Sequence, residues 1–205
     1  MEQFVINIGR QLGSGGRTVG EIIARRLGVK LYDKELINLA ARESGICPEF
    51  FEKADEKESR GVISTVVGYL RAPFVGDDGG VTNVLSNDAL FKIQSDVIRK
   101  VAAGESAVFV GRCADYILKD RPDCLHIFIH ADMEHRAARV RERYGETKQP
   151  MEKRLQEKDS KRKIYYKHYT NRNWGEAQNY HLCLNSGLIG VDKCTDIICD
   201  VAEMV

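Results

Sequence analysis

The sequence lacks a long apolar run, contains only four prolines and carries almost no excess charge of either sign. A membrane-spanning helix needs roughly 20 consecutive apolar residues, so we expect a cytoplasmic protein with no membrane contact. Lys and Arg number 31 against 30 Asp and Glu, and no basic field therefore favours nucleic acid as a partner. With 43% hydrophobic residues and so few prolines, the composition excludes disorder, collagen and coiled coil for the whole chain.

The six cysteines include no Cys-x-x-Cys pair, and no histidine lies at the spacing of a zinc finger. Cys124, Cys183 and Cys199 lie in apolar stretches, where a free cysteine packs as a small hydrophobic residue. Disulfides are also rare in the cytosol. We therefore expect free thiols and no metal site built on cysteine.

Short apolar runs rich in β-branched residues alternate along the chain with segments of helical periodicity. Five of these runs predict strands, at residues 4–8, 29–32, 106–110, 125–129 and 180–184. Because predicted helices separate the strands, we expect a parallel sheet with helices on its faces. The length of 205 residues fits one domain. The expected fold is thus α/β, a three-layer α/β/α domain over residues 1–205 with a five-stranded parallel sheet.

A glycine-rich turn joins the first predicted strand to the helix that follows it, with the sequence Gly9-Arg10-Gln11-Leu12-Gly13-Ser14-Gly15-Gly16-Arg17-Thr18. In such a turn consecutive backbone N–H groups point inward, and the helix N-terminus adds the positive end of its dipole. The alternative is a tight turn in which glycine meets only backbone demands. The strand–turn–helix context favours phosphate binding.

This turn departs from the motif G-x-x-x-x-G-K-[ST], in which lysine meets the terminal phosphates and the hydroxyl holds Mg²⁺. With Thr18 at the hydroxyl position, Arg17 stands where the lysine belongs. Shifted by one residue, the motif places Gly16 at the lysine position and Arg10 at the first glycine. Neither frame contains a lysine, so Arg17 or Arg10 must supply the positive charge, and arginine can hold phosphate in a bidentate manner.

Four features together resemble the cytidylate kinase-like family of P-loop proteins, namely the turn 13–18, Asp33 at a strand end, the pair Gly111-Arg112 and the arginine-rich helix after the fourth strand. The resemblance implies a nucleoside monophosphate kinase with a P-loop NTPase fold and a helical lid. It implies ATP and Mg²⁺ as cofactors, and a nucleotide donor and a small-molecule acceptor as partners. The irregular segment 56–87 is then a mobile insertion or the acceptor-binding subdomain, and 145–175 is the lid-like helical region.

The donor site implied by the resemblance comprises the turn and the helix after the fourth strand. The turn would hold the β-phosphate, Thr18 would coordinate Mg²⁺ through its hydroxyl, and Arg17 would replace the missing lysine. Two arginines of the later helix would stack on adenine or flank the phosphates, although a solvated charged face is the alternative. The cofactor-binding residues expected in this way are Gly13, Ser14, Gly15, Gly16, Arg17, Thr18, Arg136 and Arg139.

The acceptor site is expected at the carboxyl ends of parallel strands, where open α/β sheets bind their ligands. The resemblance implies that Arg112 holds the acceptor phosphate and that Asp33 binds acceptor groups or a metal-bound water. Cys113 replaces the aspartate that follows this arginine in the family, which leaves Asp115 as its substitute. A reactive thiol at Cys113 is the alternative to a small packing residue.

The lid implied by the resemblance would bring positive charge to the transferred group and exclude water. Lys161 and Arg162 are the expected catalytic residues there, together with Arg17 and Arg112. The alternative for the lid residues is a solvated helix with i,i+4 ion pairs. Two other functions also fit the sequence. One is a nucleotide-binding regulatory protein without transfer activity, and the other is a P-loop hydrolase or a kinase for a non-nucleotide acceptor.

Overall fold

The computed structural model describes residues 3–34, 37, 87–145 and 149–204. Its described part contains a five-stranded parallel sheet in the order β2-β3-β1-β4-β5. The strands are β1 (Val5–Arg10), β2 (Lys30–Tyr32), β3 (Ala107–Val110), β4 (Cys124–His130) and β5 (Leu182–Asn185). The five strands expected from the sequence are confirmed, each within a few residues of its predicted bounds.

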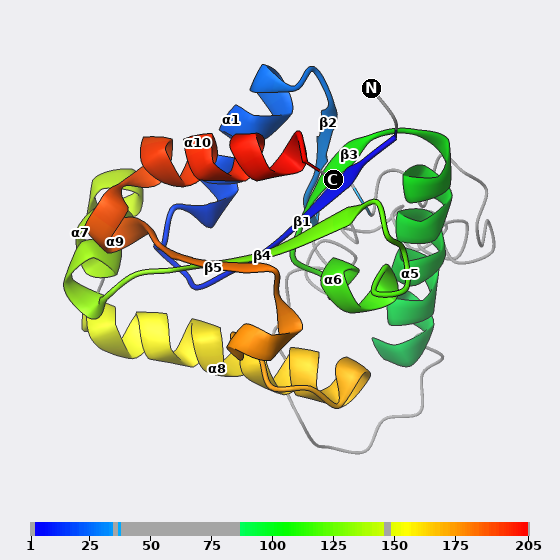
Figure 1. Ribbon diagram of the computed structural model, residues 1–205. Coiled ribbons are helices and arrows are strands. Elements are labelled where there is room, and N and C mark those ends of the chain that lie inside the picture. The colour runs from blue at the N-terminus through cyan, green and yellow to red at the C-terminus, as the bar shows by residue number, and fades with distance from the viewer. Residues whose placement is uncertain (1–2, 35–36, 38–86, 146–148, 205) are drawn as a thin grey trace, which may run out of the picture.

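Helices connect the strands and cover the sheet (Figure 1). The longer ones are α1 (Gly16–Arg26), α5 (Asn87–Gly104), α7 (Met133–Tyr144), α8 (Met151–Thr170) and α10 (Val191–Ala202). Short turns of helix form α6 (Ala114–Ile117), η2 (Ala177–Asn179) and α9 (Ser186–Ile189). No helix among the described residues is long and apolar enough to span a bilayer.

The alternation of side chains along the central strand β1 produces the three layers. Val5 packs with residues of α5 and α6 on one face of the sheet. Ile6 and Ile8 point to the other face, where they pack against α1 and α10. Both faces of β1 are therefore buried, which is typical of a parallel sheet covered by helices, and the predicted α/β/α arrangement is confirmed.

Helices α7 and α8 form a smaller apolar cluster beyond the carboxyl ends of the strands, in which Val140, Met151 and Leu155 are buried and Leu12 packs against them. This cluster ties the glycine-rich turn to α8, which lies within the expected lid region 145–175. Asp132 caps the start of helix α7, because its side chain accepts a hydrogen bond from the N–H of His135 at 2.9 Å. Of the predicted insertion, residues 56–86 lie outside the described part of the chain.

Candidate functional site

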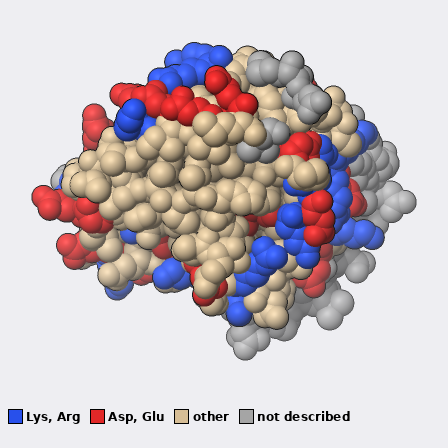
Figure 2. All heavy atoms as spheres, in the orientation of Figure 1, with Lys and Arg blue, Asp and Glu red and all other residues tan. Residues whose placement is uncertain are grey.

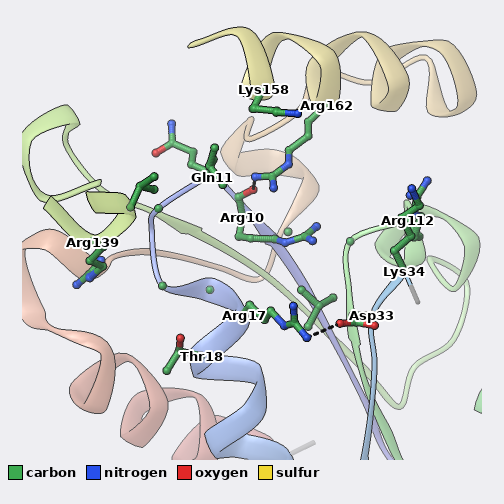
Figure 3. A pocket seen from close by; sticks show the side chains of 18 of the residues that line it. Arg10, Gln11, Arg17, Thr18, Asp33, Lys34, Arg112, Arg139, Lys158 and Arg162 are labelled. Carbon is green, nitrogen blue, oxygen red and sulfur yellow. Dashed lines mark hydrogen bonds and ion pairs between the residues drawn. The ribbon is translucent and has the colours of Figure 1, made fainter. Parts of the chain in front are cut away.

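A cavity of about 860 Å³ lies at the carboxyl ends of β1, β2 and β3, with α8 along one side (Figure 3). Positive side chains line it in excess over the acidic ones, which are Asp33, Asp115, Glu142 and Asp192. The middle of the face seen in Figure 2, over β5, carries few charged side chains by comparison. Because positive side chains exceed acidic ones around it, the cavity is suited to a large anion. Its positive residues are Arg10, Arg17, Lys34, Arg112, Arg139, Arg143, Lys158, Lys161 and Arg162.

The glycine-rich turn has the backbone geometry of an anion cradle. Gly13 has φ 78° and Gly15 has φ 75°, conformations that favour glycine. A Cβ at Gly13 would also lie 2.5 Å from the carbonyl oxygen of Arg136. Helix α1 begins at Gly16, and its first internal hydrogen bond at this end is from Val19 to the carbonyl of Gly15, at 2.9 Å. Within the described part of the chain, no acceptor meets the N–H groups of residues 15–18, which are thus free to bind phosphate oxygens.

Hydrogen bonds to neighbouring elements fix the shape of this turn. The Ser14 hydroxyl donates to the carbonyl of Gln11 at 2.9 Å, and the Gln11 side chain accepts from the N–H of Ala131 at 3.1 Å. The buried Ser186 hydroxyl donates to the carbonyl of Ser14 at 2.5 Å. Arg139 in turn donates to the carbonyl of Ser186 at 2.9 Å and lines the cavity beside the turn. The geometry thus brings Arg139 to the expected donor site, and Ser186 is a supporting residue that the sequence did not indicate.

Arg136 does not reach the cavity, contrary to the role expected for it. Only 5% of the residue is exposed, and it is not among the residues that line the cavity. Its Nε donates to the carbonyl of Leu12 at 2.8 Å, and its Nη2 forms a buried ion pair with Asp159 in α8. With these donors occupied, Arg136 holds the turn against α8 instead of stacking on a base. From the same helix, Arg143 lines the cavity along with Arg139.

Arg17 and Asp33 meet across the space between α1 and the end of β2. Nη2 of Arg17 lies 2.9 Å from the carboxylate of Asp33, and its Nε lies 3.1 Å from Glu21 one turn further along α1 (Figure 3). Asp33 is 5% exposed and lines the cavity. Both predicted residues therefore lie at the site, but the guanidinium of Arg17 is directed toward the β2 end, away from the turn.

The segment after β3 has an unusual backbone, with three successive residues in the left-handed region. Gly111 has φ 80°, Arg112 has φ 61° and Cys113 has φ 57°. Left-handed conformations cost a residue with a Cβ about 1–2 kcal/mol, and such strain is concentrated at functional sites. The turn places the Arg112 guanidinium in the cavity, 5.4 Å from the centre of the Tyr165 ring of α8. Arg112 thus lines the cavity together with the glycine turn, and its role toward the acceptor phosphate stays a prediction.

Cys113 packs beneath the strained turn with 4% of its surface exposed. Burial, followed by the nearby carboxylate of Asp115, raises the pKa of its thiol. A raised pKa keeps the sulfur protonated and unreactive at neutral pH. The structure therefore favours a small packing residue over a reactive thiol. The other described cysteines, at positions 124, 183, 194 and 199, are also free.

Asp115 lines the cavity but is largely buried, with 6% exposure. Its carboxylate accepts a hydrogen bond from the Tyr166 hydroxyl at 2.6 Å. Burial raises the pKa of Asp115, while the bond from Tyr166 acts in the opposite direction. Tyr165, Trp174 and Tyr180 also line the cavity. This end therefore offers a carboxyl group beside aromatic side chains, a combination that can bind a flat polar ring.

Helix α8 contributes the remaining predicted cations. Arg162 donates to the carbonyl of Arg10 at 3.0 Å and lies 3.5 Å from Asp159. Burial lowers the pKa of Arg162, and Asp159 acts in the opposite direction. Lys161 and Lys158 are exposed and line the cavity. The parallel sheet, the free N–H groups of a glycine turn and the cations around the cavity are the features of the P-loop class of α/β proteins.

Comparison with known proteins agrees with this class. The sequence matches the Cytidylate kinase-like family over residues 5–188, and the chain belongs to that family. A cytidylate kinase of Archaeoglobus fulgidus is 28% identical, with 97% of this chain and 94% of the relative covered. An uncharacterized protein of Eubacterium ventriosum has a crystal structure that matches with a TM-score of 0.71 and 28% identity, over 98% of this chain and 99% of that chain.

A more distant structure resembles the chain in fold alone. The shikimate kinase of Bacteroides thetaiotaomicron matches with a TM-score of 0.54 at 11% identity, over 98% of both chains. The family supports phosphotransfer as the general activity. Kinases of this type use ATP and Mg²⁺.

Proposed function

We propose that this protein transfers the γ-phosphoryl group of ATP to a nucleoside monophosphate. The observation that carries the proposal is that the free N–H groups of the glycine turn and the guanidinium of Arg112 line one cavity. A donor and an acceptor bound there would approach each other within a single space. The name of the Archaeoglobus relative favours CMP as the first acceptor to test.

The donor side of the proposed site is the turn with its flanking cations. The N–H groups of residues 15–18 would bind the phosphates of ATP, and Arg139 and Arg143 would lie beside them. Thr18 lies in the first turn of α1 and lines the cavity, and within the described part of the chain its hydroxyl has no hydrogen-bond partner. A free hydroxyl at this point fits a ligand of Mg²⁺. When bound, Mg²⁺ would neutralise charge on the terminal phosphates.

The acceptor side comprises the ends of β2 and β3. Arg112 would hold the acceptor phosphate through charge-assisted hydrogen bonds. Asp33, ion-paired with Arg17, and Asp115 beside the aromatic residues would meet the sugar and the base. We extend the proposal to the domain organisation, with residues 1–205 as one domain, 56–87 as its acceptor-binding segment and 145–175 as the region that covers the reacting groups.

The chemistry would be a direct transfer. The bond between the γ-phosphorus and its bridging oxygen breaks, a bond from an acceptor phosphate oxygen forms, and ADP leaves with the electron pair. The protein would position the two anions and neutralise the charge that separates in the loose transition state. Arg17, Arg112, Lys161 and Arg162 are the proposed catalytic residues, and α8 with its aromatic side chains would exclude water.

The test is transfer from Mg-ATP to CMP, dCMP, UMP, AMP, GMP and TMP, followed as ADP formation and as the acceptor diphosphate. We expect one pyrimidine acceptor to dominate. Arg112→Ala should lower kcat/KM for that acceptor by about 10²–10³-fold, as expected for the loss of one oriented donor at the reacting group. Arg25→Ala removes an exposed arginine on α1 outside the cavity and should leave transfer unchanged.

Two outcomes would contradict the proposal. Binding of ATP without transfer to any nucleotide would favour the regulatory function or a non-nucleotide acceptor. Loss of ATP at the same rate with and without an acceptor would indicate a hydrolase.

A further inference from the structure

The two departures of the glycine turn from the P-loop motif lie against each other in the folded chain. One frame of the motif places Gly16 at the lysine position and Arg10 at the first glycine. A Cβ built on Gly16 would lie 2.5 Å from the Cβ of Arg10 and 3.1 Å from its Cγ. No real side chain could be accommodated at 16 with Arg10 in place. In this frame the chain has a cation at position 10, where the motif has glycine, and a glycine at position 16, where the motif has the cation. The glycine at 16 leaves the space that the side chain of Arg10 occupies.

The side chain of Arg10 crosses from the turn to the acceptor side of the cavity. It begins at the end of β1, passes Gly16, and ends at Gly111, where an added Cβ would overlap its Nη1. Figure 3 shows the guanidinium between Arg162 above it and the Arg17–Asp33 pair below it. Arg10 thus lies between the residues proposed for the donor and those proposed for the acceptor, where the transferred group would pass.

The charge of Arg10 is poorly balanced by the protein itself. No carboxylate in the described part of the chain forms an ion pair with it, in contrast to Arg17, which lies beside Asp33 and Glu21. Burial and the nearby Arg162 and Arg112 guanidinium groups lower the pKa of Arg10 to about 9, although Asp33 acts in the opposite direction. A partly buried cation with other cations beside it would be stabilised by a bound anion.

We propose that Arg10, rather than Arg17, supplies the charge of the missing P-loop lysine and binds the terminal phosphates of the donor. Gly16 and Gly111 leave room for its side chain. This inference deepens the proposed function and depends on it for the identity of the donor. The binding of a polyphosphate at Arg10 can be measured by itself, without any acceptor.

The experiment measures binding of inorganic tripolyphosphate and of Mg-ATP by calorimetry, and then transfer to the preferred acceptor. Arg10→Met should weaken tripolyphosphate binding at least tenfold and lower kcat by about 10²–10³-fold, whereas Arg10→Lys should retain more of both. Arg17→Ala should weaken tripolyphosphate binding less than Arg10→Met does. The exposed Arg25→Ala variant serves as the control and should bind as the unchanged protein does.

The decisive variant restores the usual motif. Arg10→Gly removes the side chain that occupies the space beside residue 16, and Gly16→Lys then adds a lysine from the helix. We expect the double variant to bind tripolyphosphate at least tenfold more tightly than Arg10→Gly alone. Gly16→Lys by itself should bind poorly, because its side chain collides with Arg10. Circular dichroism establishes whether each variant folds, and the Arg10→Met and Arg10→Lys pair decides the question if the double variant does not.

The possible failures are distinguishable. If Arg10→Met binds tripolyphosphate as tightly as the unchanged protein, the inference is wrong even where transfer is observed. If the unchanged protein binds tripolyphosphate through Arg10 but phosphorylates no acceptor, the proposed function is wrong and the inference stands. A protein that binds neither tripolyphosphate nor ATP would overturn both.

Discussion

The carboxylate of Asp159 in α8 accepts a hydrogen bond from the backbone N–H of Leu12 in the glycine turn, at 2.9 Å. The same carboxylate forms the buried ion pair with Arg136. One side chain thus joins α8, α7 and the turn. Since the two residues of the ion pair are each almost fully buried, the loss of either leaves an uncompensated charge.

We expect Asp159→Ala to lower the free energy of unfolding by about 3–5 kcal/mol, the usual cost of breaking a buried pair from one side. Binding of tripolyphosphate should weaken as well, because the turn loses its attachment to α8. Urea unfolding monitored by fluorescence measures the first effect. The matched control is Asp196→Ala, which breaks the exposed pair with Arg26 and should cost less than about 1 kcal/mol. Equal effects of the two substitutions would contradict this account.

The strained backbone at Arg112 yields a second prediction. Arg112→Gly and Arg112→Ala both remove the guanidinium, so both should lose phosphoryl transfer. Glycine adopts a positive φ freely, whereas alanine does not, and we expect the glycine variant to be the more stable by about 1 kcal/mol.

Thermal unfolding checks this order. For a protein of this size 1 kcal/mol corresponds to roughly 2–4 °C in Tm. At an ordinary helical position alanine is the more stable of the two. A higher Tm for Arg112→Ala would therefore show that the left-handed conformation is not maintained in solution.

Asp115 provides a prediction about pH. Its pKa in the folded protein is raised above that of the unfolded chain, chiefly by burial. Between these two pKa values the folded state holds the extra proton, so stability falls as pH rises above the ordinary carboxyl range near 4. Asp115→Asn removes this effect. The variant should be more stable than the unchanged protein at pH 7, and the difference should shrink toward pH 4. A constant difference at all pH values would contradict the role of burial.

His126 gives the opposite dependence. Its pKa is lowered to about 4, first by burial and then by His181 and Arg172. The side-chain amide of Asn7 donates to its Nδ1 at 3.0 Å, which requires the unprotonated nitrogen. The unfolded chain binds a proton near pH 6.5 and the folded protein does not, so stability is lost as pH falls from 6.5 toward 4.

The lost stability should reach at most about 3 kcal/mol, which follows from the size of this pKa shift. Replacement of His126 by Gln should flatten the dependence between these pH values, as measured by urea unfolding at each pH. A slope unchanged in the variant would assign the acid sensitivity to other groups.

The strands could be predicted from the sequence because each is a short, largely apolar run, and a glycine or an aspartate directly follows three of the five. Their parallel order followed from the helices between them. The glycine turn was equally visible, since a strand, a glycine cluster and a helix follow each other directly. These features are determined by residues that are close together in the sequence, and they can therefore be recognised without the structure.

The directions of the arginine side chains could not be predicted in the same way. The spacing of Arg136, Arg139 and Arg143 suggests one helical face, yet only the last two line the cavity. Arg136 is buried because Asp159, far along the chain, lies against it. The sequence admitted both Arg17 and Arg10 as sources of charge at the turn. Only the three-dimensional structure distinguishes the two arginines. Arg17 forms ion pairs with Asp33 and Glu21. Arg10 instead packs against Gly16 and Gly111.

Arg10 belongs to β1, which has strands on both sides in the sheet and helices over both faces. Its backbone amides should therefore exchange with solvent only on global unfolding, in contrast to those of a helix that is covered on one side. A phosphate contact attached to this strand would vary little in position from one turnover to the next. Ligand binding should accordingly slow deuterium uptake in the turn and in α8 while leaving β1, already protected, unchanged.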